Sequence, residues 1–120
     1  MALTPPRIEV IIRAMARQPY TLRYARATVE HLQSIERKYH SLIFEAIEEQ
    51  LRFEPDRETR NRKPIEQPTS LDADWEIRFG PGNRFRVLYT IDPDERNVEI
   101  LAIGVKERNR LFIGGEEAEA

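Results

Sequence analysis

Residues that could bind a phosphate group alternate with apolar residues in the stretch "WEIRFGPGNRFRVLYTID" (75–92). The apolar positions are Trp75, Ile77, Phe79, Phe85, Val87, Tyr89 and Ile91. Alternation with period two is typical of strands that bury one face. The stretch therefore predicts a hairpin whose open face carries Glu76, Arg78, Arg84 and Arg86.

The register of this hairpin decides what its arginines can do. If Phe79 pairs with Phe85, "GPGNR" (80–84) is a five-residue loop and Arg78 lies opposite Arg86. Like charges opposed across two strands destabilise a sheet by roughly a few tenths of a kcal/mol. Two arrangements relieve this repulsion. Glu76 can bridge the pair, or a phosphate can lie between two guanidinium groups, whose planar forks suit its oxygens.

Two further basic clusters flank the hairpin in the sequence. One is "RNRKP" (60–64), which we expect in the loop before the hairpin, and the other is "KERNR" (106–110), which follows the apolar run "VEILAIG" (98–104). If these segments are neighbours in one sheet, both clusters can approach the arginine face. The candidate phosphate-binding residues of the clusters are Arg60, Arg62, Lys63, Lys106, Arg108 and Arg110.

The remaining pattern predicts an α+β fold, in which a small antiparallel or mixed four-stranded sheet packs on a two-helix corner. The four strands are expected in 20–25, in the two halves of 75–92, and in 98–104, which is apolar on both faces as in a central strand. Two short helices over 26–40 and 41–53 are expected to meet near His40 and Ser41. Their first apolar stripe comprises Val29, Leu32, Ile35 and Tyr39.

The ends of the chain are predicted to lie outside this core. Residues 1–19 are expected to form an extra N-terminal helix, because Ile8, Ile11, Ile12 and Met15 recur at helical spacing. The proline-containing segment 55–68 is expected to be irregular, and the acidic tail 114–120 to be disordered. The domain is thus expected over 20–113.

Composition limits the classes of function. The chain has 120 residues, no cysteine and a net charge of −2, so any anion site must be local, and neither disulfides nor thiolate metal sites are possible. No apolar run approaches the roughly 20 residues of a membrane helix, and the first residues lack the order of a signal peptide. We expect a cytoplasmic protein without a cofactor and without contact with a membrane.

Other candidates for chemistry are few. No spacing of His, Asp and Glu predicts a metal site, and the helix aromatics do not predict a platform for stacking bases. We expect His31 and His40 at surface or corner positions, and Tyr89 in the core. Glu76 is the one candidate general base, although pairing with Arg78 is the more ordinary explanation for it, and the sequence offers no general acid.

Taken together, the element order, the "RNRKP" loop, "W-x-I-R-x-G…F-R-V-L-Y-x-I-D" and "V-x-I-L-A-I-G-V-K-E-R-N-R-L" resemble the RelE/ParE superfamily of toxin–antitoxin toxins over roughly residues 20–113. The resemblance implies a cognate antitoxin that masks the active face. RelE-like members cut messenger RNA on the ribosome, whereas ParE-like members inhibit DNA gyrase without nuclease chemistry.

The resemblance also implies roles for particular residues. The family's strand arginine falls on Arg86 and a basic residue of the preceding strand on Arg78. The basic pair after the central strand falls on Lys106 and Arg108. Glu76 stands where RelE-like nucleases carry a second lysine, and Phe112 where they carry a C-terminal tyrosine. Three functions remain open: a ribosome-dependent endoribonuclease, a toxin that inhibits a protein such as gyrase, and a domain that mediates assembly alone.

Overall fold

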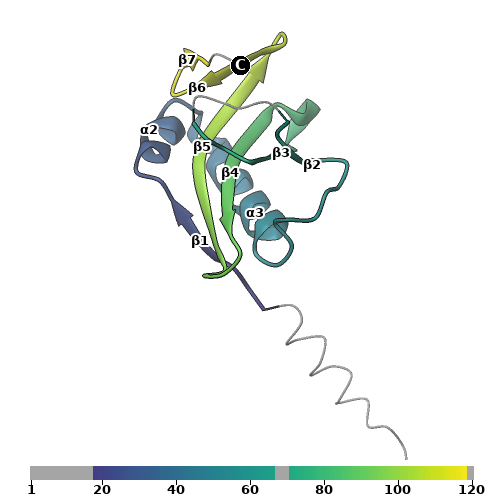
Figure 1. The fold of residues 1–120 in the computed structure, drawn as a ribbon. Coiled ribbons are helices and arrows are strands. Elements are labelled where there is room, and N and C mark those ends of the chain that lie inside the picture. Colours follow the sequence, from purple (N-terminus) through teal and green to yellow (C-terminus); the bar gives the residue numbers. More distant parts are fainter. Residues whose placement is uncertain (1–17, 67–70, 119–120) are drawn as a thin grey trace, which may run out of the picture.

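Strands from the whole described chain join in one mixed sheet (Figure 1). The structure is a computed structural model that describes residues 18–66 and 71–118. The helix predicted over residues 1–19 therefore lies outside the described residues, apart from Gln18 and Pro19, which are not helical. Its seven described strands are β1 (Thr21–Tyr24), β2 (Arg62–Pro64), β3 (Trp75–Phe79), β4 (Phe85–Asp92), β5 (Asn97–Glu107), β6 (Arg110–Ile113) and β7 (Glu116–Glu117). The order β2-β3-β4-β5-β6-β7 is antiparallel throughout, and β1 pairs in parallel with β5. The predicted α+β class is confirmed.

Three of these strands lie where no strand was predicted, so the prediction of four strands is wrong. β2 forms in the proline-containing segment, where its position at the sheet edge tolerates Pro64. β6 forms in a segment for which no element was predicted, and β7 forms where a disordered tail was expected. Two-residue turns with positive φ connect them, Arg108–Asn109 before β6 and Gly114–Gly115 before β7, which is the backbone of a tight hairpin.

The break between the two helices lies earlier in the chain than predicted. α2 (Ala27–Gln33) ends before the short 3-10 helix η1 (Arg37–Tyr39), which leads directly into α3 (His40–Leu51). The break thus lies at 34–36, not near His40. His40 closes this corner, since its Nε2 lies 2.8 Å from the carbonyl oxygen of Leu32 and 2.9 Å from that of Ile35. No helix among the described residues is long and apolar enough to cross a bilayer.

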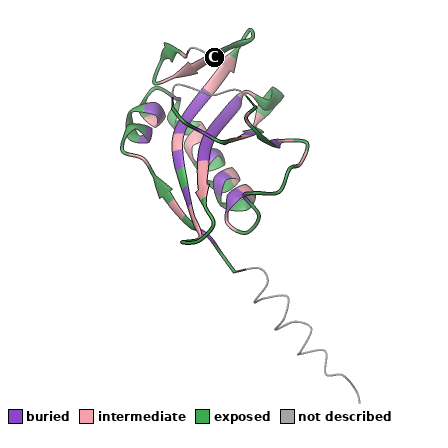
Figure 2. Ribbon diagram, in the orientation of Figure 1, coloured by how far each residue is buried: buried purple, intermediate pink, exposed green. Residues whose placement is uncertain are grey.

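The helices cover one face of the sheet, which we call the inner face. From α3, the side chains of Ile43, Ile47 and Leu51 are fully buried against the strands. The strand side chains of this core are Ile77, Phe79, Phe85, Val87, Tyr89, Val98, Ile100 and Ile103. Figure 2 shows the resulting buried stretch along the middle of β4 and β5. Tyr89 lies in the core, as predicted.

A bulge in β5 explains why its sequence is apolar on both faces. Leu88 pairs with Ala102 and Tyr89 with Ile100, so Leu101 is an extra residue in β5. Because the bulge shifts the alternation by one residue, Ile100 below it and Ile103 above it both join the inner core. The apolar run therefore has two causes: the inward-facing positions change from even to odd residue numbers at the bulge, and the strand is central in the sheet.

His31 fills a gap along the other edge of β5. β1 pairs with residues 97–100 of this edge and β6 with residues 104–107, which leaves the bulged segment between them unpaired by strands. There the backbone N–H of Ile103 donates to Nδ1 of His31, at 3.3 Å. His31 is 9% exposed, so the predicted surface or corner position is wrong for it. Conversely, Val29 of the predicted apolar stripe is 57% exposed.

A second apolar cluster covers part of the opposite face, which we call the outer face. Ala73, Leu88 and Ala102 are buried there, and Ile65 and Ile113 pack against them. Ile65, just after β2, and Ala73, just before β3, are two members of this cluster, so these two positions lie over that part of the face. The outer face stays open farther along β3 and β4, towards the loop that joins them.

A candidate phosphate-binding site

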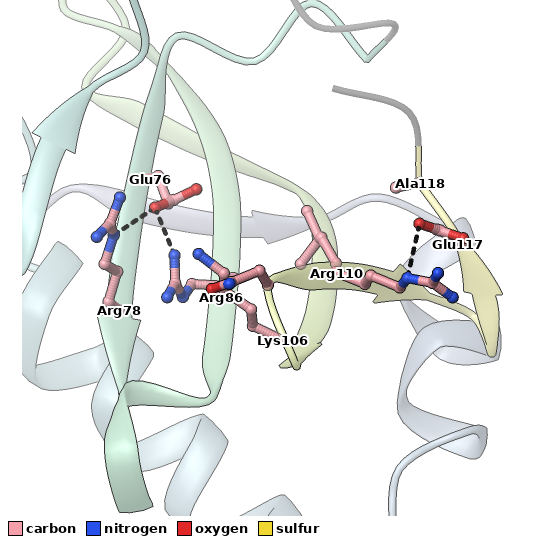
Figure 3. Close-up of a pocket in the computed structure, with 9 residues that line it drawn as sticks. Glu76, Arg78, Arg86, Lys106, Arg110, Glu117 and Ala118 are labelled. Atoms are coloured by element: carbon pink, nitrogen blue, oxygen red, sulfur yellow. Dashed lines mark hydrogen bonds and ion pairs between the residues drawn. The ribbon is translucent and has the colours of Figure 1, made fainter.

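Two arginines lie opposite each other on the open part of the outer face. Phe79 pairs with Phe85 and Arg78 with Arg86, which is the register that the sequence predicts. Oε1 of Glu76 accepts from Nε of Arg78 at 2.7 Å and from Nη1 of Arg86 at 3.3 Å. Figure 3 shows this carboxylate between the two guanidinium groups. One carboxylate oxygen thus offsets the repulsion between two cations.

The loop between β3 and β4 holds Arg86 in place. Gly80 has φ +82°, and a Cβ there would lie 2.4 Å from the ring of Phe85, so the loop needs glycine at this position. The turn that follows presents the carbonyl oxygen of Asn83, which accepts from Nε of Arg86 at 3.2 Å. Two different acceptors therefore fix the orientation of the Arg86 fork.

Burial separates the two arginines. The side chain of Arg86 is 10% exposed, whereas that of Arg78 is 44% exposed. Burial lowers the pKa of the Arg86 guanidinium, the carboxylate of Glu76 raises it, and the charge of Arg78 lowers it. Arginine remains protonated in proteins, so Arg86 is a fixed cation in a partly dehydrated place. Such a cation interacts more strongly with an anion than an exposed one does.

A pocket of about 650 Å³ extends from this cluster towards β6 and β7. Glu76, Arg78, Arg86, Lys106 and Arg110 line it, together with Asn109, Leu111, Glu117 and Ala118. Nε of Arg110 lies 3.7 Å from Oε1 of Glu117, and both side chains are exposed (Figure 3). Among the described residues no carboxylate lies within ion-pair distance of Lys106. The pocket therefore carries four cations and two carboxylates, with one cation unpaired.

Gly104 allows β6 to form the far wall of this pocket. It lies between Arg86 of β4 and Ile113 of β6 in the sheet. A Cβ at this position would lie 2.9 Å from the carbonyl oxygen of Phe112, so only glycine lets the two strands approach this closely. Gly104 is thus the point of close contact between β5 and β6.

The other predicted phosphate-binding residues lie away from the pocket. Arg62 is buried, and donates to the carbonyl oxygen of Arg57 at 2.6 Å and to that of Gln50 at 2.5 Å. It fastens the chain before β2 to the end of α3, which is a structural role. Lys63 lies opposite Glu76 on the sheet but its Nζ is 3.7 Å from Glu58.

Arg60, Arg84 and Arg108 do not line the pocket either. Arg60 is exposed in the turn before β2. Arg84 faces the helix side, 3.6 Å from Glu107. Arg108 occupies the turn between β5 and β6, so only Lys106 of the basic pair lines the pocket. Sequence reasoning missed Asn109, Leu111, Glu117 and Ala118, because it did not predict the β6–β7 hairpin that carries them to the site.

The arrangement can bind and polarise a phosphate, and it offers little acid or base chemistry. Glu76 and Glu117, the two carboxylates that line the pocket among the described residues, are both ion-paired. His31 contacts β5 through its edge, and His40 closes the helix corner, as predicted for a corner residue. The described residues contain no group of three side chains that could hold a metal ion.

One of three comparisons with known proteins finds a match, and that match bears on the fold. No family model and no curated protein matches the chain. Among solved structures, a chain of the toxin–antitoxin complex RelBE2 from Mycobacterium tuberculosis matches with a TM-score of 0.56 and 24% identity, over 73% of this chain and 99% of that chain. At this identity the likeness shows the fold, which is therefore RelE-like, as the sequence resemblance implied.

Proposed function

We propose that the protein is the toxin of a toxin–antitoxin pair and cuts messenger RNA on the ribosome without a metal ion. The RelE-like fold supports the toxin class, and the structural neighbour is part of a toxin–antitoxin complex. The observation that carries the proposal is the cation cluster on the open face, in which Glu76 bridges Arg78 and Arg86 beside Lys106, which forms no ion pair with any described residue. The proposal places the toxin in the cytoplasm, where it would meet ribosomes.

In this proposal the cations act on the scissile phosphate. Cleavage begins when the 2′-hydroxyl of the RNA attacks the adjacent phosphorus and the bond to the 5′-oxygen breaks, which leaves a cyclic phosphate. Negative charge grows on the phosphate oxygens in the transition state, and preorganised cations stabilise it. Arg86, Arg78 and Lys106 would supply this stabilisation. Arg110 would hold a neighbouring phosphate once the strand displaces Glu117.

Cleavage also needs a base for the 2′-hydroxyl and an acid for the leaving 5′-oxygen. Oε1 of Glu76 takes both ion pairs, so Oε2, which takes part in neither, is the candidate base for the 2′-hydroxyl. The leaving 5′-oxygen needs a proton, and we assign its donor to the ribosome or the RNA. This dependence on a second component is the reason to propose cleavage on the ribosome and not in free solution.

A second candidate is a toxin that binds a protein target such as DNA gyrase and cleaves no RNA. One observation favours it: the two carboxylates of the pocket are tied up in ion pairs with arginine. A carboxylate oxygen that accepts from two guanidinium groups is not free to take the proton of the 2′-hydroxyl. In this candidate the same cations would bind acidic side chains of the target.

Controlled expression without an antitoxin tests the proposal. The wild type is compared with Lys106→Gln, which replaces a partly exposed lysine of the pocket. The control is Lys63→Gln, which replaces an exposed lysine on the same face of the sheet but outside the pocket. We expect growth arrest and new RNA 5′ ends inside translated messages for the wild type and Lys63→Gln, and loss of both for Lys106→Gln. Arrest with intact messages would favour the gyrase-type candidate, and soluble wild-type protein without any arrest would overturn both.

An antitoxin is the implied partner. We propose that it is encoded beside this gene and covers the Arg78–Arg86 face with acidic or apolar residues. We also propose that residues 1–19 are an extension of the functional unit, which begins at residue 20 and which the β6–β7 hairpin carries beyond residue 113 to Ala118. Removal of residues 1–18 should then leave growth arrest unchanged, and a loss of arrest in a folded, truncated protein would contradict this division.

A further inference from the structure

A second pocket, of about 350 Å³, lies on the inner face beside the end of α2. It is lined by Tyr39 of η1, Phe112 of β6 and Arg84, together with the polar residues Ser34 and Glu107. We call it the Tyr39–Arg84 pocket. Tyr39 and Phe112 are each partly exposed, although they are aromatic. The pocket is separate from the candidate phosphate site, since the two share no lining residue.

A third pocket connects the first two around the tip of the β5–β6 hairpin. It shares Arg110 with the phosphate site, and Glu107 and Phe112 with the Tyr39–Arg84 pocket. Its remaining lining residue is Arg108. Neighbouring hollows thus lead from the cations of the outer face, past Arg108, to the aromatic rings of the inner face.

The Tyr39–Arg84 pocket has the chemistry of a site for a planar heteroaromatic group. The guanidinium of Arg84 lies 5.3 Å from the ring centroids of both Tyr39 and Phe85. Stacked aromatic and guanidinium planes are the groups on which bases of single strands stack. Arg84 supplies hydrogen-bond donors, and the carboxylate of Glu107 supplies acceptors at 3.6 Å from it.

The two sites lie beside the same short segment of the chain. Arg84 ends the turn before β4 and Arg86 is the second residue of β4, and their side chains lie on opposite faces of the sheet. The third pocket lies between the two sites, at the tip of the β5–β6 hairpin. A strand with a phosphate at Arg86 and Lys106 can therefore pass the hairpin tip and reach the second pocket.

We propose that the Tyr39–Arg84 pocket binds a nucleobase of the same single-stranded RNA whose phosphate lies against Arg86 and Lys106. This inference rests on the proposed function and adds a base-binding subsite to it. Arg84 then contributes to affinity through the base, whereas Lys106 contributes through phosphate alone. A strand that lacks the base should accordingly be indifferent to Arg84.

Binding of short RNA strands tests the proposal. Fluorescence anisotropy is measured with labelled six-nucleotide RNAs, either intact or fully abasic, against the full chain. The variants are Arg84→Gln and, as a matched control, Arg23→Gln, which removes an exposed arginine on β1 that lines neither pocket. We expect Arg84→Gln to weaken binding of the intact strand by about three- to fivefold, the usual size of a cation–π contact. The abasic strand should bind Arg84→Gln and wild type equally.

The remaining outcomes separate the two proposals. If Lys106→Gln weakens binding while Arg84→Gln matches Arg23→Gln on both strands, the base subsite is wrong and the phosphate site stands. If neither strand binds the wild type, or if Lys106→Gln has no effect, the RNA-binding function itself fails. A six-residue polyglutamate peptide that binds as tightly as the intact RNA, with the same loss in Arg84→Gln, would overturn the base assignment in favour of an acidic peptide.

Tyr39→Leu gives a second test because it removes a ring and leaves the charge unchanged. We expect it to weaken binding of the intact strand by about five- to a hundredfold, the range reported by truncation of a stacking ring, and to spare the abasic strand. Since Tyr39 also packs on Phe85, with ring centroids 5.2 Å apart, unfolding curves must first show a cooperative transition. Equal losses for both strands in a folded variant would contradict a base-specific role.

Discussion

Two neighbouring cross-strand pairs of the β3–β4 hairpin, which we call rungs, have opposite effects on the stability of the sheet. Phe79 and Phe85 form one rung on the inner face, with ring centroids 5.8 Å apart in the core. Arg78 and Arg86 form the next rung on the outer face, where Glu76 bridges them. The aromatic rung gains free energy by burial, whereas the arginine rung places like charges together and needs a third residue to tolerate it.

This difference indicates which rung serves the fold and which serves binding. A sheet needs its inner rungs filled by apolar side chains, and any polar residue would satisfy the outer ones. Two opposed arginines, one of them nearly buried, exceed what solubility requires. The cations are held ready by the same hairpin that forms the core, so an anion that binds there meets preoriented donors.

Phe85→Ala should break the inner rung with the largest effect. Phe85 is fully buried, and removal of a buried phenylalanine ring costs about 3–5 kcal/mol of unfolding free energy. Arg84 lies over this ring, so the variant should also loosen the Tyr39–Arg84 pocket. Urea unfolding followed by circular dichroism measures the loss.

Phe44→Ala is the matched control for that loss. Phe44 lies on α3, is 41% exposed, and contacts Tyr24 with ring centroids 5.8 Å apart. Its removal should cost about 1 kcal/mol or less, because Phe44 is already well exposed to water. Equal losses for the two variants would mean that the inner rung is no more important than the surface of α3.

Sequence reasoning predicted the inner rung because two independent signals agree there. Alternation of apolar residues set the faces of both strands, and the glycine and proline residues of 80–84 set the loop length, so the register followed. At the far end of the sheet the signals conflicted. The Gly114–Gly115 pair favours a tight hairpin, but the acidic composition of the tail favoured disorder, and β7 forms on the turn signal.

The arginine rung was also predictable, whereas the sorting of the surrounding cations was not. A sequence shows that Arg62 and Arg84 are basic, but only tertiary structure shows that Arg62 caps the end of α3 and that Arg84 lies on the helix side. His31 was placed at the surface for a similar reason. Its burial follows from a bulge at Leu101 that opens a gap in the edge of β5, and no local pattern announces that gap.

Glu76→Gln should weaken the outer rung by a smaller amount. The variant keeps the shape of the side chain and removes the negative charge, so the partly buried Arg86 loses its ionic partner. We expect a loss of about 1–2 kcal/mol in unfolding free energy, as for other hydrogen bonds to charged groups. Thermal unfolding measures it, and added inorganic phosphate should restore more stability to the variant than to the wild type, because a bound anion replaces the lost charge.

Glu48→Gln is the control for this prediction. It removes the carboxylate of an exposed ion pair, in which Oε1 of Glu48 lies 2.5 Å from Nη2 of Arg52. Exposed pairs of this kind contribute about 0.3–0.5 kcal/mol, so the loss should be slight, with no rescue specific to phosphate. Phosphate that stabilises both variants to the same extent would argue against an anion site between Arg78 and Arg86.

The smallest expected effect is a pH dependence of stability that arises from His31, which contacts β5. Burial lowers the pKa of His31, against a smaller opposing effect of Glu30, so the folded state favours the neutral ring that accepts the N–H of Ile103. Below the ordinary pKa of about 6.5 the unfolded chain binds a proton that the folded chain resists. Stability is therefore full above that pH and declines as the pH falls from 6.5 towards the lower folded-state pKa. His31→Gln keeps an acceptor for Ile103 without a titrating ring, so its stability should change less between pH 7 and pH 5.5 in urea titrations. An identical decline in the variant would assign this pH dependence to groups other than His31.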